Sequence, residues 1–169
     1  MIAVPPDAHL ILAILDTEQR NTFLIVENDA NDAFLIHRAL QETPNCGSSV
    51  VCRNPGEAKA YLLGAGLYRD RHRFPFPDVV ITDLNMGAES GIELVDWIRK
   101  QAAPLKDIKV VILTGSASPL QFDAAEKVGA QGVYRKPNTL DDLREVLSSI
   151  AQQFCPKQPS PASQQHADR

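Results

Sequence analysis

Four short apolar runs in the sequence are each followed by polar side chains that suit phosphoryl chemistry. These side chains are acids, an amide, a hydroxyl and an ammonium, found at Glu27-Asn28-Asp29, Asp83, Thr114 and Lys136. If the runs are parallel strands, the side chains meet at one edge of the sheet, because ligands bind outside the carboxyl ends of such strands. A carboxylate with acids, a hydroxyl and an ammonium beside it predicts a phosphoryl-accepting site that is assisted by a cation.

The apolar runs are typical of buried strands, since they are short and rich in β-branched residues. We expect strands at 23–26, 50–52, 79–82, 109–113 and 132–135. We expect helices at about 31–42 and 55–63, after Ser90, from Ser118 to Gly129, and at 140–154. Five strands that alternate with five helices predict an α/β fold, a doubly wound five-stranded parallel sheet covered by helices on both faces.

Local signals support two of these helices. Ser90 is a good N-cap, and Glu93 three residues later completes a capping box. The last helix carries one apolar stripe at helical spacing, formed by Leu140, Leu143, Leu147 and Ile150.

The connection at 67–77 is longer than a typical turn, which makes it a candidate contact surface. Within it we expect the run 69–73 to be a solvated loop face.

The length of 169 residues fits one domain with extra residues at both ends. We assign this domain to residues 21–154. Residues 1–20 form an N-terminal extension, either a short apolar helix or a leader without fixed structure. Residues 155–169 are rich in Pro, Ser and Gln, so we expect a disordered polar tail.

Composition excludes several classes of protein. A chain with 44% apolar and 22% charged residues is ordinary for a globular domain, and a net charge of −4 gives no reason to expect nucleic-acid binding. The apolar run 10–15 is too short to span a membrane, and no basic residue precedes Arg20 as a secretory signal would require. Cys46, Cys52 and Cys155 lack metal-type spacing. We expect a cytoplasmic protein with free thiols.

Taken together, the motifs resemble the receiver domain of two-component signalling, which has the CheY-like fold. They are the acidic cluster after the first strand, Asp83-Leu84-Asn85-Met86, Val111-Ile112-Leu113-Thr114 and Lys136-Pro137. The resemblance covers residues 22–154 and implies the strand order 2-1-3-4-5. Residues 60–77 are also similar to a group of small stand-alone response regulators that includes the partners of bacterial and cyanobacterial phytochromes.

The resemblance implies a role for each site residue. Asp83 would accept a phosphoryl group from a phosphohistidine on a sensor histidine kinase, of phytochrome type. Mg²⁺ is implied as the cofactor, since phosphoryl transfer depends on positioning and charge neutralisation. Its ligands would be Glu27, Asn28, Asp83 and the backbone carbonyl of Asn85.

Two further residues are implied on the phosphoryl side. Lys136 would hold a phosphoryl oxygen as a point charge. The hydroxyl of Thr114 would bond the phosphoryl group and pull its loop inward, as a two-state switch. Ser116 is an accessory candidate that would share this role.

Three positions depart from the family pattern. Asn28 stands where the family usually has a second carboxylate, so we expect weaker metal binding unless Asp29 swings in. Asn28 itself is either a weak ligand or loop filler. Gly87 replaces the usual Pro four residues after the acceptor, which predicts a looser loop. Val133 replaces the usual aromatic switch residue, and strand alternation predicts that Tyr134 faces the other side.

The sequence suggests three functions. The first is a single-domain response regulator that signals by protein–protein contact with a downstream protein of unknown identity, or as a homodimer, without a DNA-binding or catalytic domain. The alternative is a phosphorylation-independent pseudo-receiver, a binding module with the same fold. A phosphatase is disfavoured because Asn85 stands two residues after Asp83, where that chemistry wants a general acid. We therefore expect no enzyme.

Overall fold

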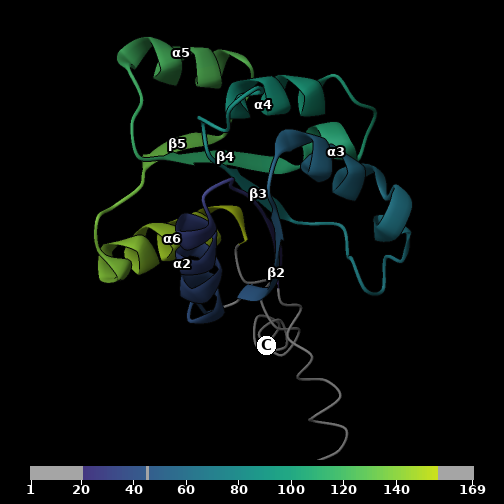
Figure 1. The fold of residues 1–169 in the computed structure, drawn as a ribbon, viewed down its shortest axis with the longest axis horizontal. Helices are drawn as coiled ribbons and strands as arrows, with labels where there is room; N and C mark the ends of the chain where they lie inside the picture. The colour runs from purple at the N-terminus through teal and green to yellow at the C-terminus, as the bar shows by residue number, and fades with distance from the viewer. Residues whose placement is uncertain (1–20, 45, 156–169) are drawn as a thin grey trace, which may run out of the picture.

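The computed structural model describes residues 21–44 and 46–155. Its five strands form one parallel sheet in the order β2-β1-β3-β4-β5 (Figure 1). The strands are β1 (Asn21–Val26), β2 (Cys46–Cys52), β3 (Val79–Thr82), β4 (Lys109–Thr114) and β5 (Gly132–Arg135). The helices are α2 (Ala30–Gln41), α3 (Pro55–Leu63), α4 (Gly91–Arg99), α5 (Pro119–Lys127) and α6 (Leu140–Phe154), with short 3₁₀ helices η1 (Gly66–Arg69) and η2 (Leu105–Asp107). The predicted fold class and strand order are confirmed.

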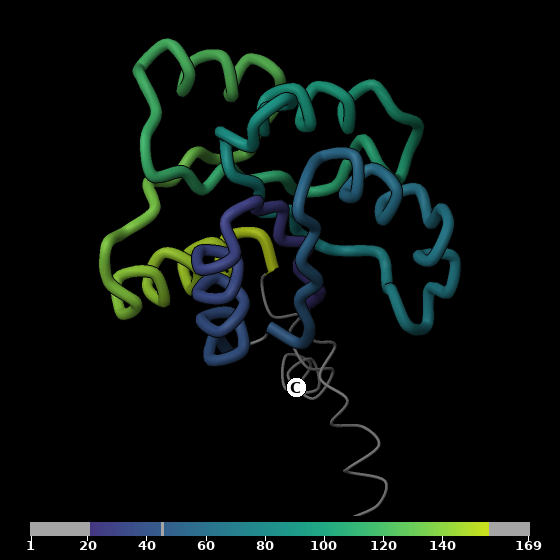
Figure 2. Tube along the Cα trace, in the orientation of Figure 1, coloured from purple at the N-terminus to yellow at the C-terminus, as the bar shows by residue number. Residues whose placement is uncertain are grey.

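Helices cover both faces of the sheet. α2 and α6 lie on one face, and α3, α4 and α5 lie on the other (Figures 1 and 2). Alternate residues of each central strand face opposite layers, as in β1, where Leu24 and Val26 join the core under α3–α5. Phe23 and Ile25 join the core under α2 and α6. Two apolar cores on opposite sides of one sheet therefore hold the domain together.

The last strand shows the same alternation. Val133 packs against the α3–α5 core, whereas Tyr134 packs against the α2–α6 core. The Tyr134 hydroxyl donates a hydrogen bond to Oε1 of Gln153 at 3.1 Å. The prediction that Tyr134 faces away from the usual switch position is confirmed.

The edge strand β2 is longer than the sequence indicates. It begins at Cys46 rather than Val50, because its backbone pairs with β1 from Asn21 to Val26. The added residues, 46–49, include Gly47 and none of them is buried, so they lack the apolar pattern on which the prediction depended.

Side-chain caps begin the helices. The Ser90–Glu93 capping box at α4 is present as predicted, and a second one joins Ser118 and Gln121 at α5. At the other end of the chain, Cys155, the first residue of the predicted tail, is buried at the C-cap of α6. The predicted extension 1–20 and the tail residues 156–169 lie outside the described residues.

The connection between α3 and β3 is partly a packed structure. The rings of Tyr61, Tyr68 and Phe74 form an edge-to-face cluster with centroids 5.1–6.3 Å apart. Arg71 lies against this cluster, 5.8 Å from the Tyr61 ring, and donates a hydrogen bond to the carbonyl of Leu62 at 2.8 Å. The interpretation of the whole run 69–73 as a solvated face is therefore wrong for Arg71.

Among residues 21–44 and 46–155, no helix has both the length and the apolar character needed to cross a membrane.

Candidate functional site

Strand register brings the predicted site residues to one edge of the sheet. Val26 pairs with Thr82, so that the next residues, Glu27 and Asp83, are neighbours. Hydrogen bonds fix this edge, from the Asp83 N–H to the Val26 carbonyl at 2.9 Å and from the Lys136 N–H to the Thr114 carbonyl at 2.7 Å. The carboxyl ends of β1, β3, β4 and β5 therefore each contribute residues to one site.

The Lys136 ammonium is the centre of the charged part of the site. Its Nζ lies 2.5 Å from Oε2 of Glu27, 2.8 Å from Oδ2 of Asp32 and 3.4 Å from Oδ2 of Asp83. Glu27 is 1% exposed and the Lys136 side chain 12%. One cation therefore faces three carboxylates in a largely buried setting.

Burial and pairing act in opposite directions on these charges. Burial raises the pKa of Glu27, and its bonds to Lys136 and to the Asp29 N–H oppose this only in part. Burial alone would lower the pKa of Lys136, but its hydrogen bonds to Asp32 and Glu27 outweigh burial and the pKa is raised. Lys136 is consequently a fixed positive charge at neutral pH.

Asp83 opens the β3–α4 loop (residues 83–90) and is held by the backbone around it. Its Oδ1 accepts a hydrogen bond from the Leu84 N–H at 2.6 Å, while Oδ2 faces Lys136. A Cβ added at Gly91 would overlap the carbonyl oxygen of Asp83, so only glycine lets the start of α4 lie this close. The Asp83 side chain is 11% exposed, which leaves a narrow approach from solvent.

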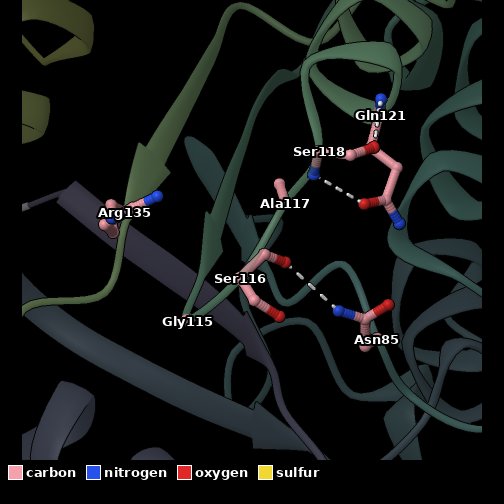
Figure 3. Close-up of a pocket in the computed structure, with 7 residues that line it drawn as sticks. All are labelled: Asn85, Gly115, Ser116, Ala117, Ser118, Gln121 and Arg135. Atoms are coloured by element: carbon pink, nitrogen blue, oxygen red, sulfur yellow. Dashed lines mark hydrogen bonds between the residues drawn. The ribbon is translucent and has the colours of Figure 1, made fainter.

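On the other side of the site, the polar groups around the Ser116 carbonyl are uncharged and the space is more open. The buried hydroxyl of Thr114 donates to the carbonyl of Ser116 at 3.2 Å, and Nδ2 of Asn85 donates to the same carbonyl at 3.4 Å. Beside these residues lies a hollow of about 470 Å³, lined by Asn85, Gly115, Ser116, Ala117, Ser118, Gln121 and Arg135. Figure 3 shows the Asn85 amide directed at Ser116 from one side of this hollow, with Arg135 on the other.

The two residues after Glu27 have different surroundings. Asn28 is exposed, and within the described part of the chain its side chain makes no hydrogen bond. The carboxylate of Asp29 caps α2, accepting hydrogen bonds from the N–H groups of Asn31 at 2.8 Å and Asp32 at 3.0 Å. These bonds lower the pKa of Asp29. An accessory role for Asp29 would require it to give up this cap.

Sequence reasoning missed Asp32. The predicted site residues follow directly after the strands, whereas Asp32 lies in the first turn of α2. Side chains of a helix tilt toward its N-terminus, so an acid in the first turn overhangs the end of the preceding strand. That tilt, with the helix start predicted near Asn31, was the signal that could have found it.

The oxygen donors at this edge are of the type that Mg²⁺ prefers. The carboxylates of Glu27 and Asp83 lie here, and the predicted further donors are the amide of Asn28 and the backbone carbonyl of Asn85. Within residues 21–44 and 46–155, no group of three or more His, Cys, Asp and Glu side chains is arranged to hold a metal ion. The donor set fits the cation in type, but it depends on the Asn28 amide and on a backbone carbonyl.

Known proteins share this sequence pattern. Residues 23–148 match the model of the response regulator receiver domain. The chain is 32% identical over 164 residues to the virulence sensor protein BvgS of Bordetella pertussis, covering 94% of this chain and 12% of BvgS. It is 37% identical over 73 residues to the chemotaxis protein CheY-3 of Vibrio cholerae, covering 43% of this chain and 55% of CheY-3. The chain thus spans about an eighth of BvgS and about half of CheY-3.

Solved structures share the fold. The phosphorylated cyanobacterial phytochrome response regulator RcpA superposes with a TM-score of 0.73 at 25% identity, covering 84% of this chain and 99% of that one. The response regulator RPA3017, from red light signalling of R. palustris, gives 0.73 at 21% identity over 82% of this chain and 96% of that one, which shows the fold alone. The Mn²⁺-bound form of the response regulator Rcp1 superposes with a TM-score of 0.69 at 24% identity, covering 82% of this chain and 97% of that one, and it likewise shows the fold alone. From the match over 23–148 and the shared strand order, the chain belongs to the response regulator receiver domain family.

Proposed function

We propose that this chain is a response regulator receiver that accepts a phosphoryl group on Asp83 from a sensor histidine kinase. The observation that carries the proposal is the distance of 3.4 Å between Oδ2 of Asp83 and the Lys136 ammonium, at the edge where four strands end. A carboxylate at this position has a nucleophilic oxygen and a cation beside it. These are the two protein groups that phosphoryl transfer to an acid requires.

The proposed transfer is a displacement at phosphorus. An oxygen of Asp83 attacks the phosphorus of a phosphohistidine, an O–P bond forms, and the N–P bond breaks so that the imidazole leaves. Lys136 then pairs with a phosphoryl oxygen as a point charge. Thr114 turns its hydroxyl from the Ser116 carbonyl to the phosphoryl group, which moves the β4–α5 loop (residues 115–118). Ser116 lies in that loop and supplies a second hydroxyl.

Mg²⁺ is the proposed cofactor, held by Glu27, Asn28, Asp83 and the carbonyl of Asn85. A bound divalent ion supplies neutralisation of the charge that gathers on the phosphoryl oxygens. Because Asn28 is neutral, the site carries one negative charge fewer at this position than a pair of acids would give. We therefore propose that binding is weaker than in a receiver with both acids, and that Asn28→Asp strengthens it.

The test is intact mass after incubation with acetyl phosphate and magnesium. We expect the mass of one phosphoryl group on the wild type, none on Asp83→Asn, and faster addition to Asn28→Asp. Asp123→Asn, an exposed acid on α5, is the matched control and should behave as the wild type. A wild type that stays unmodified with this donor and with a phosphohistidine donor would contradict the proposal.

The kinase, the output and the chain organisation belong to the same proposal. Similarity to RcpA at 25% identity supports a phytochrome-type sensor kinase as the phosphoryl donor. We propose that output is protein–protein contact by the domain 21–154, with a downstream protein or a second copy of the chain, in the cytoplasm and without enzymatic turnover. The extension 1–20 and the polar tail, counted from residue 156 because Cys155 is buried at the C-cap of α6, would flank this domain.

A phosphorylation-independent binding module is the second candidate. The observation that favours it is the exposed Asn28, which has no hydrogen bond within the described residues and adds no charge to the site. Gly87 and Val133 add support, since both depart from the family pattern. This function predicts that partner binding is the same in Asp83→Ala and after metal removal, and a large change in affinity in either case would argue against it.

A further inference from the structure

Asp32 contacts the proposed phosphoryl-binding lysine from outside the set of strand-end residues. Its Oδ2 accepts a hydrogen bond from Nζ of Lys136 at 2.8 Å. The Lys136–Glu27 contact is of similar length, at 2.5 Å, whereas the contact to Asp83 is longer, at 3.4 Å. In this state, therefore, Lys136 lies closer to Asp32 on α2 and to Glu27 just after β1 than to Asp83.

The backbone of Asp32 is anchored although its carboxylate is accessible. Its N–H is bonded to the Asp29 cap at 3.0 Å, which fixes the first turn of α2. Its side chain is 42% exposed, whereas Glu27 is almost fully buried. Water can replace the lysine at Asp32 at little cost, but not at Glu27, because an unpaired buried charge is strongly disfavoured. Of the two short contacts of Lys136, the one to Asp32 is the easier to exchange.

The charge balance of the site gives Asp32 a second reason to matter. Asn28 contributes no charge, so the carboxylates around Lys136 are Glu27, Asp32 and Asp83. Three carboxylates and one ammonium give a net charge of −2. Asp32 thus supplies from a helix the negative charge that position 28 lacks, and it does so next to the lysine.

We propose that Asp32 is a positioning residue that holds the Lys136 ammonium closer to itself than to Asp83 until a phosphoryl group arrives. Lys136 then leaves Asp32 for the phosphoryl oxygen while it stays bound to Glu27. The exchange frees the first turn of α2 from the site, so that the surface of α2 differs between the two states. This inference rests on the proposed function, because it requires a phosphoryl group on Asp83.

The test uses beryllofluoride, a phosphoryl mimic, with the full chain at magnesium concentrations that saturate each variant. Asp32→Asn removes the competing carboxylate, so we expect half-saturation at about fivefold lower beryllofluoride, equivalent to about 1 kcal/mol. Asp32→Ala should tighten binding similarly, which excludes a new contact of the Asn amide as the cause. Asp32→Glu restores a carboxylate and should return to wild-type affinity, and Asp123→Asn controls for the change in net charge.

A second readout separates positioning from a merely structural role. The NMR chemical shifts of the backbone amides of residues 31–33 should change when beryllofluoride binds to the wild type and to Asp32→Glu. They should not change when it binds to Asp32→Asn. Equal or weaker beryllofluoride binding by both Asp32→Asn and Asp32→Ala, with normal binding by the wild type, would overturn the inference and leave the proposed function standing. A wild type that binds no beryllofluoride and takes up no phosphoryl group would overturn both.

Discussion

The two sides of the site differ in how firmly their groups are held. The charged half consists of Lys136 with the largely buried Glu27 and Asp83 and the half-exposed Asp32, and it contains contacts of 2.5 and 2.8 Å around one ammonium. The neutral half, Asn85, Thr114 and Ser116, has contacts of 3.2 and 3.4 Å beside an open hollow. Because longer hydrogen bonds and open space cost little to rearrange, we expect the neutral half to move, whereas in the charged half only the exposed contact of Lys136 to Asp32 should exchange.

The largest expected effect comes from removing the centre of the charged half. Lys136→Met leaves Glu27 buried without its partner, so the free energy of unfolding should fall by about 3 kcal/mol at neutral pH. Lys59→Met is the matched control, since Lys59 pairs with Glu89 in a more exposed position and should cost less than about 1 kcal/mol. Urea unfolding measures both, and equal losses would mean that the charged half is not specially organised.

Two glycines, one in each half of the site, test how tightly the backbone is packed there. Gly91→Ala forces a Cβ into the carbonyl of Asp83, so we expect a loss of about 2 kcal/mol and slower uptake of the phosphoryl group. Gly115→Ala, in the β4–α5 loop, meets open space and should change stability by less than about 0.5 kcal/mol. Thermal unfolding ranks the two variants, and a reversed order would contradict the comparison.

Thr114→Val tests the neutral half directly. It removes one hydrogen bond to the Ser116 carbonyl, so stability should fall by only about 1 kcal/mol. We expect a clearer effect on NMR chemical shifts: the changes that beryllofluoride induces in the amides of the β4–α5 loop should become smaller. Ser116→Ala keeps the backbone carbonyl and serves as the control for stability. Full loop shifts in Thr114→Val would show that the hydroxyl is not the moving contact.

The smallest expected effect is a pH dependence at the start of α2. Hydrogen bonds from the N–H groups of Asp32 and Asn31 lower the folded-state pKa of Asp29 below its usual 3.8. Its charge therefore stabilises the fold fully above pH 3.8, and this contribution is lost as the pH falls through the folded-state value. Asp29→Asn keeps a cap without the charge, so it should be slightly less stable than the wild type near neutral pH and equal to it in strong acid. Urea unfolding at several pH values checks this, and a constant difference would contradict it.

The sequence was sufficient to predict the fold because the central elements carry clear patterns. The buried strand Val79–Thr82 and the stripe of α6 are apolar at the spacing that their positions in the sheet require. β2 was underestimated because backbone pairing at an edge needs no apolar side chains. Arg71 was misjudged because a charged side chain that lies on aromatic rings looks like a solvated one in sequence.

The site could be predicted only in part. Residues just past the strand ends were found, since parallel strands bring such positions together whatever the details of packing. Asp32 was missed because its contact with Lys136 spans 104 positions and depends on the tilt of a helical side chain. The cap formed by Asp29 was missed because Asp serves equally well as a ligand and as a helix cap, and only the placement of α2 decides between them.

The single tryptophan gives the molecule a built-in optical reporter. Trp97 lies on α4, and the ammonium of Lys59 is 5.5 Å from the centre of its ring. The same ammonium pairs with Glu89 in the β3–α4 loop that begins at Asp83. A change in that loop which moves Glu89 will shift the cation beside the indole and alter its fluorescence. If phosphorylation of Asp83, as proposed, rearranges this loop, emission from this one ring would follow it in real time, without any label.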